Sequence, residues 1–318
     1  MLGLAAALIG CAPVVKPAGP AVRAPAAEPA ALVMADGARL PRHRWLAEGP
    51  PRAILLGLHG FNDHGGNFML DSLAALTAAG VEVHAYDQRG FGAAPGRGYW
   101  PGAATLSADA ATAIRLLRTE HPGLPLMLLG ESMGGAVALL ALAEAPPVDR
   151  VALLTPAIWS RDQMGPVMRG GLWLMGRTMP AMRAGGGVSG VVASDNVAAL
   201  RRLARDPLVI GAPRFDALIG LVDLMDEAAA ALPGCCAVPT LLLAGAQDSV
   251  VPAGPMRAAL AGVGPGLRTG LYGDGYHLLL AGAGRALVVA DLLAFLADPA
   301  APLPSGADTA VGVWIRPR

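Results

Sequence analysis

The sequence predicts an α/β fold in which a mostly parallel central sheet is covered by helices on both faces. Short apolar runs alternate with longer alanine- and leucine-rich segments, as strands and helices alternate in such sheets. Turn residues, glycine and aspartate above all, follow several of the apolar runs. The chain has 318 residues, 54% of them hydrophobic, which is enough to bury a large core.

The first half of the domain contains four expected parallel strands, each an apolar run bounded by turn residues. An antiparallel strand around residues 43–46 is expected to precede them. The four expected strands are 53–58, 81–86, 124–129 and 150–155. The helices expected between them, from apolar residues at helical spacing, are 67–79, 105–119 and 133–144.

The second half begins with an insertion over about 159–232, which we expect to be a helical cap placed after the sixth strand. Strands are expected again at 239–245 and 267–272, and helices at 254–262 and 284–297. The domain is thereby expected to span 32–298, and a Pro/Ala/Gly-rich tail at 299–318 is expected to be irregular.

The N-terminal residues differ in composition from the domain. Residues 1–11 are apolar but too short to span a bilayer, and they resemble the apolar region of a secretory signal. Leu8-Ile9-Gly10-Cys11 is similar to a bacterial lipobox, in which Cys11 would be lipidated, although no basic segment precedes it. Either this leader anchors a lipoprotein or it is only an apolar tail. The Pro/Ala-rich residues 12–31 are expected to form a flexible linker.

Composition excludes several classes of function. The formal net charge is zero and basic residues are scattered, so nucleic-acid binding has no electrostatic support. The one lysine, Lys16, lies in the expected linker, which argues against a catalytic lysine. No dinucleotide motif follows a strand and no His/Cys/Asp cluster has metal-ligand spacing, so we expect no cofactor and no metal. Of the three cysteines, Cys235 and Cys236 are adjacent, and no disulfide framework is expected.

Gly130-Glu131-Ser132-Met133-Gly134 is the most informative motif of the chain. It stands between an expected strand and an expected helix, which is the context of a nucleophile elbow. The flanking glycines allow a sharp turn that exposes the Ser132 hydroxyl. The alternative is a glycine-rich helix start with an inert serine.

A serine nucleophile needs a base and an acid that orients the base, and both are expected after it in the chain. Among six histidines only His277 follows Ser132. Asp248 follows the expected strand 239–245 and precedes a turn, so it is the best candidate for the acid. Other carboxylates are weaker candidates because they lie on an expected helix or in other loops: Asp206, Asp223, Asp226, Glu227 and Asp274.

An oxyanion hole is expected from two backbone N–H groups. One belongs to Met133, directly after the nucleophile. The other comes from the loop that begins His59-Gly60 after the strand 53–58, and Phe61 is its expected donor.

These motifs together resemble the α/β-hydrolase superfamily, and within it the branch of monoacylglycerol lipases, lysophospholipases and "serine aminopeptidases". The resemblance covers about residues 32–298. Glu131 departs from it, since histidine is commoner before the serine, and Gln247 stands where aspartate is usual. The residues that carry the resemblance are His59-Gly60-Phe61 through His64, Asp87-Gln88-Arg89-Gly90-Phe91-Gly92, Ser132 with Met133-Gly134-Gly135, Asp206-Pro207-Leu208, Gly245 through Asp248 with Val251-Pro252, and His277.

The insertion lies where this superfamily places its cap, and it is rich in methionine, which adapts to varied acyl chains. We expect a substrate pocket lined by cap residues, although a helical pair buried on the core explains them too. Three arginines in the same region could contact lipid phosphates or form a solvated face: Arg169, Arg177 and Arg183. The expected pocket residues are Met164, Met168, Trp173, Met175 and Met179.

The resemblance implies a serine hydrolase that cleaves carboxylic esters through an acyl-enzyme, with a monoacylglycerol or lysophospholipid as substrate. Two alternatives stay open: an aminopeptidase or amidase that uses the same three residues, and a catalytically silent binding lipoprotein. The expected location is the bacterial cell envelope, with the protein tethered to the membrane surface through Cys11; the alternative is the cytoplasm.

Overall fold

The computed structural model describes residues 12–185, 190–261, 263–264 and 266–309. Its centre is a nine-stranded sheet with strand order β1-β2-β3-β5-β4-β6-β7-β8-β9. The pairs β1–β2, β2–β3 and β3–β5 are antiparallel, and all pairs from β5 through β4 to β9 are parallel. The strands are Ala26–Glu28 (β1), Ala31–Val33 (β2), Arg39–Trp45 (β3), Ala53–Leu58 (β4), Val81–Tyr86 (β5), Leu126–Glu131 (β6), Arg150–Leu154 (β7), Thr240–Gly245 (β8) and Leu267–Tyr272 (β9).

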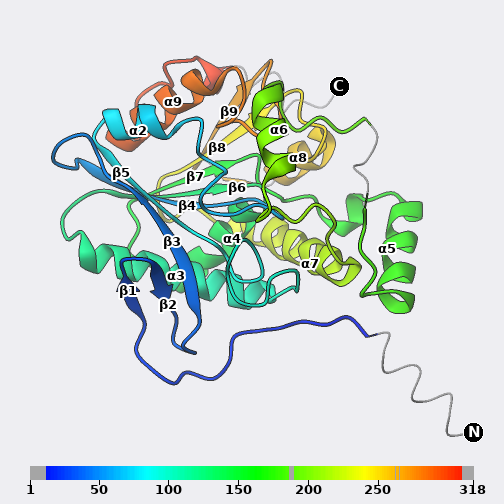
Figure 1. The fold of residues 1–318 in the computed structure, drawn as a ribbon. Helices are drawn as coiled ribbons and strands as arrows, with labels where there is room; N and C mark the ends of the chain where they lie inside the picture. Colours follow the sequence, from blue (N-terminus) through cyan, green and yellow to red (C-terminus); the bar gives the residue numbers. More distant parts are fainter. Residues whose placement is uncertain (1–11, 186–189, 262, 265, 310–318) are drawn as a thin grey trace, which may run out of the picture.

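Helices cover both faces of the sheet (Figure 1). On one face, α3 and α4 pack with the cap helix α7 against one half of the strand side chains; on the other, α2 and α9 cover the alternate set. This explains why the central strands are continuous apolar runs rather than alternating ones. The helices are Leu73–Ala78 (α2), Ala103–Glu120 (α3), Met133–Ala141 (α4), Pro166–Thr178 (α5), Val197–Arg205 (α6), Phe215–Ala231 (α7), Ala253–Leu260 (α8) and Arg285–Ala297 (α9).

The expected α/β fold and its element order are confirmed, and most bounds agree within a few residues. The helix expected over 67–79 is shorter, because α2 begins only at Leu73 and turns occupy the residues before it. The cap follows β7 rather than a sixth strand. The N-terminal hairpin of β1 and β2 contains strands too short to give a periodic pattern in the sequence.

Residues 12–31 do not form the free linker that the sequence predicts. β1 lies within them, and the preceding residues are bonded to the domain. The N–H of Val14 donates to Asp216 at the start of α7, that of Lys16 to the Trp100 carbonyl, and that of Ala18 to Thr105 of α3.

The C-terminal residues that the structure describes also contact the domain. Leu303 and Ala307 are buried against the face that α9 covers. Ser305 donates a hydrogen bond to the buried Asp291 of α9. The described part of the expected tail is therefore packed, although it contains no strand or long helix.

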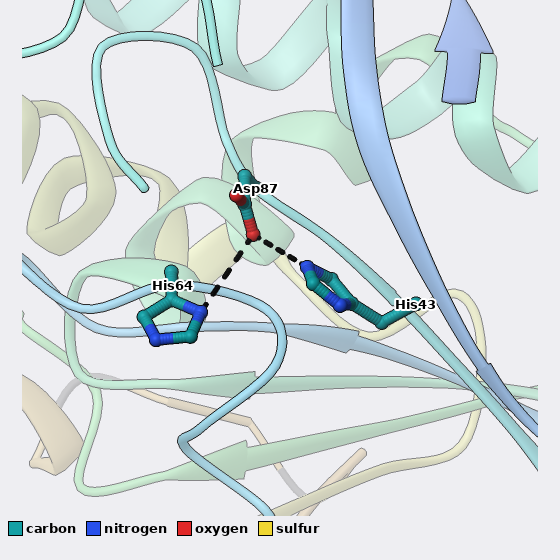
Figure 2. A group of neighbouring side chains, drawn as sticks. All are labelled: His43, His64 and Asp87. Atoms are coloured by element: carbon teal, nitrogen blue, oxygen red, sulfur yellow. Dashed lines mark hydrogen bonds and ion pairs between the residues drawn. The ribbon is translucent and has the colours of Figure 1, made fainter. Parts of the chain in front are cut away.

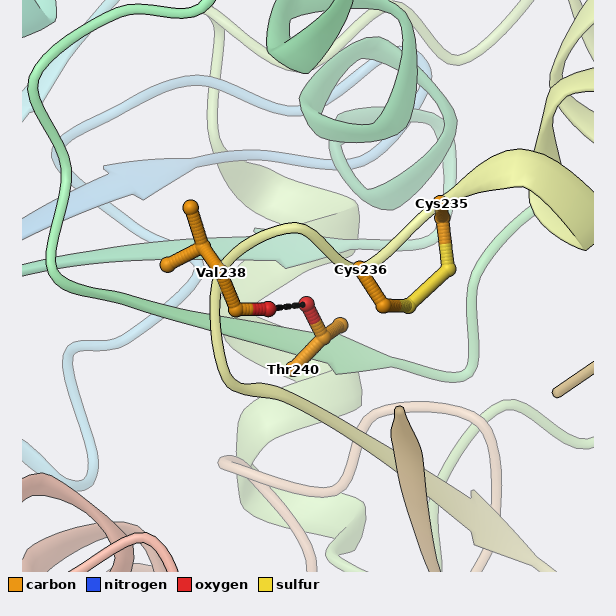
Figure 3. Close-up of a disulfide and its surroundings, with 4 residues drawn as sticks. All are labelled: Cys235, Cys236, Val238 and Thr240. Atoms are coloured by element: carbon orange, nitrogen blue, oxygen red, sulfur yellow. Dashed lines mark hydrogen bonds between the residues drawn. A yellow bond between two sulfur atoms is a disulfide. The ribbon is translucent and has the colours of Figure 1, made fainter. Parts of the chain in front are cut away.

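A disulfide joins the adjacent Cys235 and Cys236, a pairing that the sequence does not predict (Figure 3). It lies where the chain returns from the cap to the sheet, between the short helix Leu232–Gly234 (η3) and β8. At the start of β8, the Thr240 hydroxyl donates to the Val238 carbonyl, 2.8 Å away. Cys11, the expected lipidation site, lies outside the described residues. Within the described ranges, no helix has both the length and the hydropathy to cross a bilayer.

Candidate active site

Ser132 occupies the turn between β6 and α4, in a conformation that few non-glycine residues adopt. Its φ is 53° and its ψ is −117°. A Cβ on Gly134 would collide with the Leu58 carbonyl, and one on Gly130 would collide with the backbone of Gly134. The glycines of the motif are thus required by close backbone contacts, and the strained serine is the geometry of a nucleophile elbow.

His277 and Asp248 form a buried pair at the ends of neighbouring strands. Asp248 follows β8, His277 follows β9, and 2.8 Å separates His277 Nδ1 from Asp248 Oδ2. The other oxygen, Oδ1, accepts the N–H groups of Val250 and Val251, so the carboxylate is fixed in orientation. Because the carboxylate accepts a hydrogen bond from Nδ1–H, the Nε2 atom of a neutral His277 keeps its lone pair for another group.

Thr155 connects the pair to the elbow. It follows β7, the strand between β6 and β8, and its hydroxyl donates to the His277 carbonyl at 2.9 Å. The Ser132 N–H donates to Leu154, the residue before Thr155, and the Ser132 carbonyl accepts from Ala157. The structure therefore brings the elbow and the histidine loop to the two sides of one segment at the carboxyl edge of the sheet. Sequence reasoning missed Thr155; its place directly after a strand was the only signal.

The two expected oxyanion donors also lie at this edge. A Cβ on Gly60 would be 3.4 Å from the Ser132 Cβ, so the loop that continues into Phe61 passes directly beside the nucleophile. Met133 is the first residue of α4, where backbone N–H groups have no partner within the helix.

His59 shapes this loop from within. Its Nδ1 lies 2.8 Å from the Gly60 carbonyl, and its Nε2 accepts the Gln88 N–H at 2.9 Å. The same glutamine donates its side-chain amide to the His59 carbonyl. Burial lowers the pKa of His59, so the ring is neutral and acts as a fixed donor and acceptor.

Glu131, directly before the nucleophile, is buried without a partner for its Oε1 atom. Burial, and after it the charges of Asp63 and Asp248, raise the pKa of Glu131 well above its usual value. Burial therefore favours the neutral form of this carboxyl group over a negative charge next to the His277–Asp248 pair.

Two of the five expected pocket residues of the cap line a common cavity. Met164 and Trp173 line a cavity of about 640 Å³ between α5 and α7, together with Ala12 and Pro13. No residue of the Ser132, Asp248 and His277 set lines it. Met168, Met175 and Met179 do not line this cavity, and Met168 and Met179 are exposed on the surface of the cap. The other lining residues are Arg161, Arg169, Leu172, Gly176, Arg177, Ile219 and Val222.

Comparison with known proteins gives consistent results. A family model described as serine aminopeptidase, S33, matches residues 49–282. Monoacylglycerol lipase of Mycolicibacterium smegmatis is 28% identical over 232 residues, which are 68% of this chain and 77% of that protein. Monoglyceride lipase of Mus musculus is 29% identical over 222 residues, 68% of this chain and 72% of that protein.

Solved structures of similar fold include two lipases of the same kind. Paleococcus ferrophilus monoacylglycerol lipase superposes with a TM-score of 0.66 at 23% identity, over 82% of this chain and 99% of that one. A soluble variant of the Saccharomyces cerevisiae monoglyceride lipase, in complex with a substrate analog, gives 0.70 at 17% identity, over 88% and 99%.

Proposed function

The chain belongs to the serine aminopeptidase S33 family of α/β-hydrolases and is a carboxylic ester hydrolase; from this premise we propose that Ser132, His277 and Asp248 cleave monoacylglycerols. The observation that carries the proposal is the pair of His277 and Asp248 held at the same sheet edge as a strained Ser132. The names of the relatives in M. smegmatis and mouse support the substrate class.

In the proposed reaction His277 Nε2 takes the proton of the Ser132 hydroxyl while the oxygen attacks the ester carbonyl. The N–H groups of Phe61 and Met133 stabilise the oxyanion that forms. His277 then gives its proton to the departing glycerol oxygen, which leaves an acyl-Ser132 intermediate. A water molecule, deprotonated by His277, releases the fatty acid and restores the serine. Asp248 remains ionised throughout and stabilises the imidazolium.

The test of the nucleophile uses covalent labelling and kinetics. A fluorophosphonate probe should label the protein, and Ser132→Ala should abolish labelling and lower kcat by about 10⁴-fold or more. Ser107→Ala is the matched control, because this hydroxyl bonds only within its own helix, to the Ala104 carbonyl of α3. Labelling that survives Ser132→Ala would overturn the assignment of the nucleophile.

The substrate class is tested separately, with monoacylglycerols and simple esters of graded chain length. We expect long acyl chains to be preferred; a preference for acetyl esters would contradict the lipid assignment while leaving the hydrolase intact.

An aminopeptidase activity is the second candidate, because the matching family model carries that description. Such an enzyme needs a free carboxylate to bind the substrate's α-amino group. In the cap, Asp223 and Asp226 both bind Arg161, so neither carboxylate is free for this role. Aminoacyl anilides assayed beside p-nitrophenyl esters separate the two activities, and faster turnover of the anilides would favour the peptidase.

The lipoprotein anchor is part of the proposal. The described chain begins at Ala12, the residue after the expected lipidation site, and Ala12 lines the cavity beside α5. The outer face of α5 is apolar, with Val167 87% and Leu174 51% exposed. Such a helix suits a membrane interface. Membrane fractionation should find the wild-type protein in the membrane fraction and the Cys11→Ser variant in the soluble fraction. A variant that stays in the membrane fraction with the wild type would contradict the anchor.

A further inference from the structure

Three polar side chains outside the candidate active site converge on one another: His43, His64 and Asp87 (Figure 2). His43 comes from β3, His64 from the loop after β4, and Asp87 from the end of β5. His43 Nε2 lies 2.8 Å from Asp87 Oδ1, and His64 Nδ1 lies 4.0 Å from the same oxygen. All three potential ligand atoms lie within 4.8 Å of one another.

The neighbours of His64 determine which of its nitrogens carries the proton. Nε2 is 3.0 Å from Oδ2 of Asp206 in the cap, and a carboxylate can only accept, so Nε2 holds the hydrogen. On the other side the Gly66 N–H donates to Nδ1 at 3.2 Å, so Nδ1 presents a lone pair. Two electron-pair donors, His64 Nδ1 and Asp87 Oδ1, therefore face each other with no proton between them.

Asp87 is held rigidly in this position. Its Oδ1 accepts the Gly65 N–H at 3.0 Å and its Oδ2 accepts the Ala93 N–H at 2.8 Å. A Cβ on Gly92 would collide with the Asp87 carboxylate, so only glycine lets the chain wrap so closely around it. Asp87 and His64 are buried, whereas the His43 side chain keeps 27% of its surface exposed, which gives the group access to solvent.

A second group of similar composition, Glu82, His84 and His121, lacks these properties. Arg42 donates to His84 Nδ1 at 3.1 Å, which places the His84 proton on Nε2, the atom that faces Glu82. Arg44 donates to the carboxylate of Glu82 at 2.6 Å. Two guanidinium groups repel a cation, and the tautomer blocks coordination by His84.

We propose that His43 Nε2, His64 Nδ1 and Asp87 Oδ1 bind a divalent transition-metal ion, Zn²⁺ foremost. Two imidazoles and one carboxylate, with solvent as a fourth ligand, are a donor set that suits zinc. Asp206 supplies the carboxylate that commonly holds the outer nitrogen of a metal-bound histidine. To bind the metal, His43 carries its proton on Nδ1, so its Nε2 no longer donates to Asp87. At His64 the metal takes the place of the Gly66 N–H, which donates to Nδ1 at 3.2 Å.

The metal would fasten together β3, the loop with Phe61 and the cap, and it takes no part in the ester chemistry. The proposal does not rest on the proposed function, because its test measures metal binding alone.

The experiment uses the full chain in a Cys11→Ser background, which removes the one cysteine outside the disulfide. Metal-free protein is titrated with Zn²⁺ in competition with a chromophoric chelator. We expect one equivalent to bind with a Kd below about 1 µM, and Co²⁺ to give the absorption of a tetrahedral site. His43→Ala should weaken binding at least about 100-fold, and Asp206→Asn about 10- to 100-fold. His121→Ala, from the second group, should leave the affinity unchanged.

Failure of the Cys11→Ser protein, with no further substitution, to bind Zn²⁺ or Co²⁺ tighter than about 100 µM would overturn the proposal. Binding that survives His43→Ala but is lost in His121→Ala would assign the metal to the second group. This result would also overturn the proposal. If a ligand variant fails to fold, the Co²⁺ spectrum of the Cys11→Ser protein still tests the site, since an octahedral spectrum would also contradict the proposal.

Discussion

Ser132 and Thr155 are both held at positive φ, 53° and 41°, and both stand directly after strands at the carboxyl edge of the sheet. Non-glycine residues are rarely found there, and the strain persists only where surrounding contacts enforce it. Here those contacts are the glycines of the elbow and the hydrogen bond from Thr155 to the His277 carbonyl. The strained residues lie where the proposed chemistry requires fixed positions.

Thr155→Val tests this positioning role. The variant keeps the shape of the side chain but removes one of the two hydrogen bonds to the buried His277 carbonyl, which keeps only the Leu279 N–H, 3.1 Å away. The loss of one such bond costs about 0.5–1.5 kcal/mol. We expect the His277 loop to lose its fixed position, so kcat for ester hydrolysis should fall about tenfold or more while KM changes little. Equal kcat in the variant, at unchanged thermal stability, would show that Thr155 is not needed to place the histidine.

Glu131→Gln tests the buried acid. The pKa of Glu131 is raised in the folded protein above the value of 4.5 for a free side chain. Above pH 4.5 the folded state therefore binds more protons than the unfolded chain, and this residue lowers stability as pH rises towards the folded pKa. Glutamine has no such penalty, so the variant should gain up to about 1.4 kcal/mol over wild type for each pH unit.

Urea unfolding of both proteins at about pH 5, 6.5 and 8 measures this difference. A gap in unfolding free energy that stays constant across the three values would show that Glu131 ionises normally. Activity at neutral pH should be retained in the variant, since the neutral carboxyl and the amide are similar in size and charge.

At the scale of elements, the glycines of the chain serve opposite purposes. In the elbow they allow backbone segments to approach so closely that a Cβ atom would collide, as at Gly134 against the Leu58 carbonyl. In α5, by contrast, a Cβ added to Gly170 or Gly171 would meet no neighbouring group within 4 Å, so these glycines only weaken the helix. The helix α5 therefore has a low intrinsic stability, and what holds it in place is its packing against α7 on the other side.

The two glycine classes give opposite predictions. Gly134→Ala should lower stability by about 2–3 kcal/mol and abolish fluorophosphonate labelling, because α4 must shift away from β4 and displace Ser132. Gly171→Ala should raise stability by up to about 1 kcal/mol, from helix propensity alone. Thermal unfolding and probe labelling of both variants check this. Normal labelling of Gly134→Ala would contradict the tight elbow.

At the scale of the whole molecule, buried ion pairs join segments that are far apart in the sequence. Arg89, after β5, binds both Asp36 in the turn between β2 and β3 and Asp109 of α3. All three side chains are at most 8% exposed. Burial raises the pKa of Asp109 despite its arginine partner, so this carboxylate depends on Arg89 to remain charged. A partly exposed pair, Arg202 and Asp71, connects the cap to the core.

Arg89→Ala should therefore destabilise the protein by about 3–5 kcal/mol, because it leaves two buried carboxylates without a counter-charge. Arg115→Ala breaks an exposed pair with Glu144 and should cost no more than about 1 kcal/mol. Denaturant midpoints of the two variants give the comparison. Equal losses would show that burial does not determine the strength of these pairs.

The sequence by itself determined the order of strands and helices, because burial on both faces produces apolar runs and turns need particular residues. It also indicated Ser132, Asp248 and His277, since only one histidine follows the elbow and one aspartate follows the right strand. These three residues each follow a strand, and the carboxyl ends of parallel strands lie along the same edge of the sheet. The sequence could therefore predict that they lie close together.

Only the tertiary structure decided the rest. His43, His64 and Asp87 lie on three segments whose spacing carries no motif, and they meet because β3, β4 and β5 are neighbours in the sheet. The same holds for Arg89 and its two partners, and for Thr155 beside the His277 carbonyl. The β1–β2 hairpin and the cavity under α5 depend likewise on packing against distant residues. Local periodicity reports which side of an element is buried, but not which distant side chain it meets there.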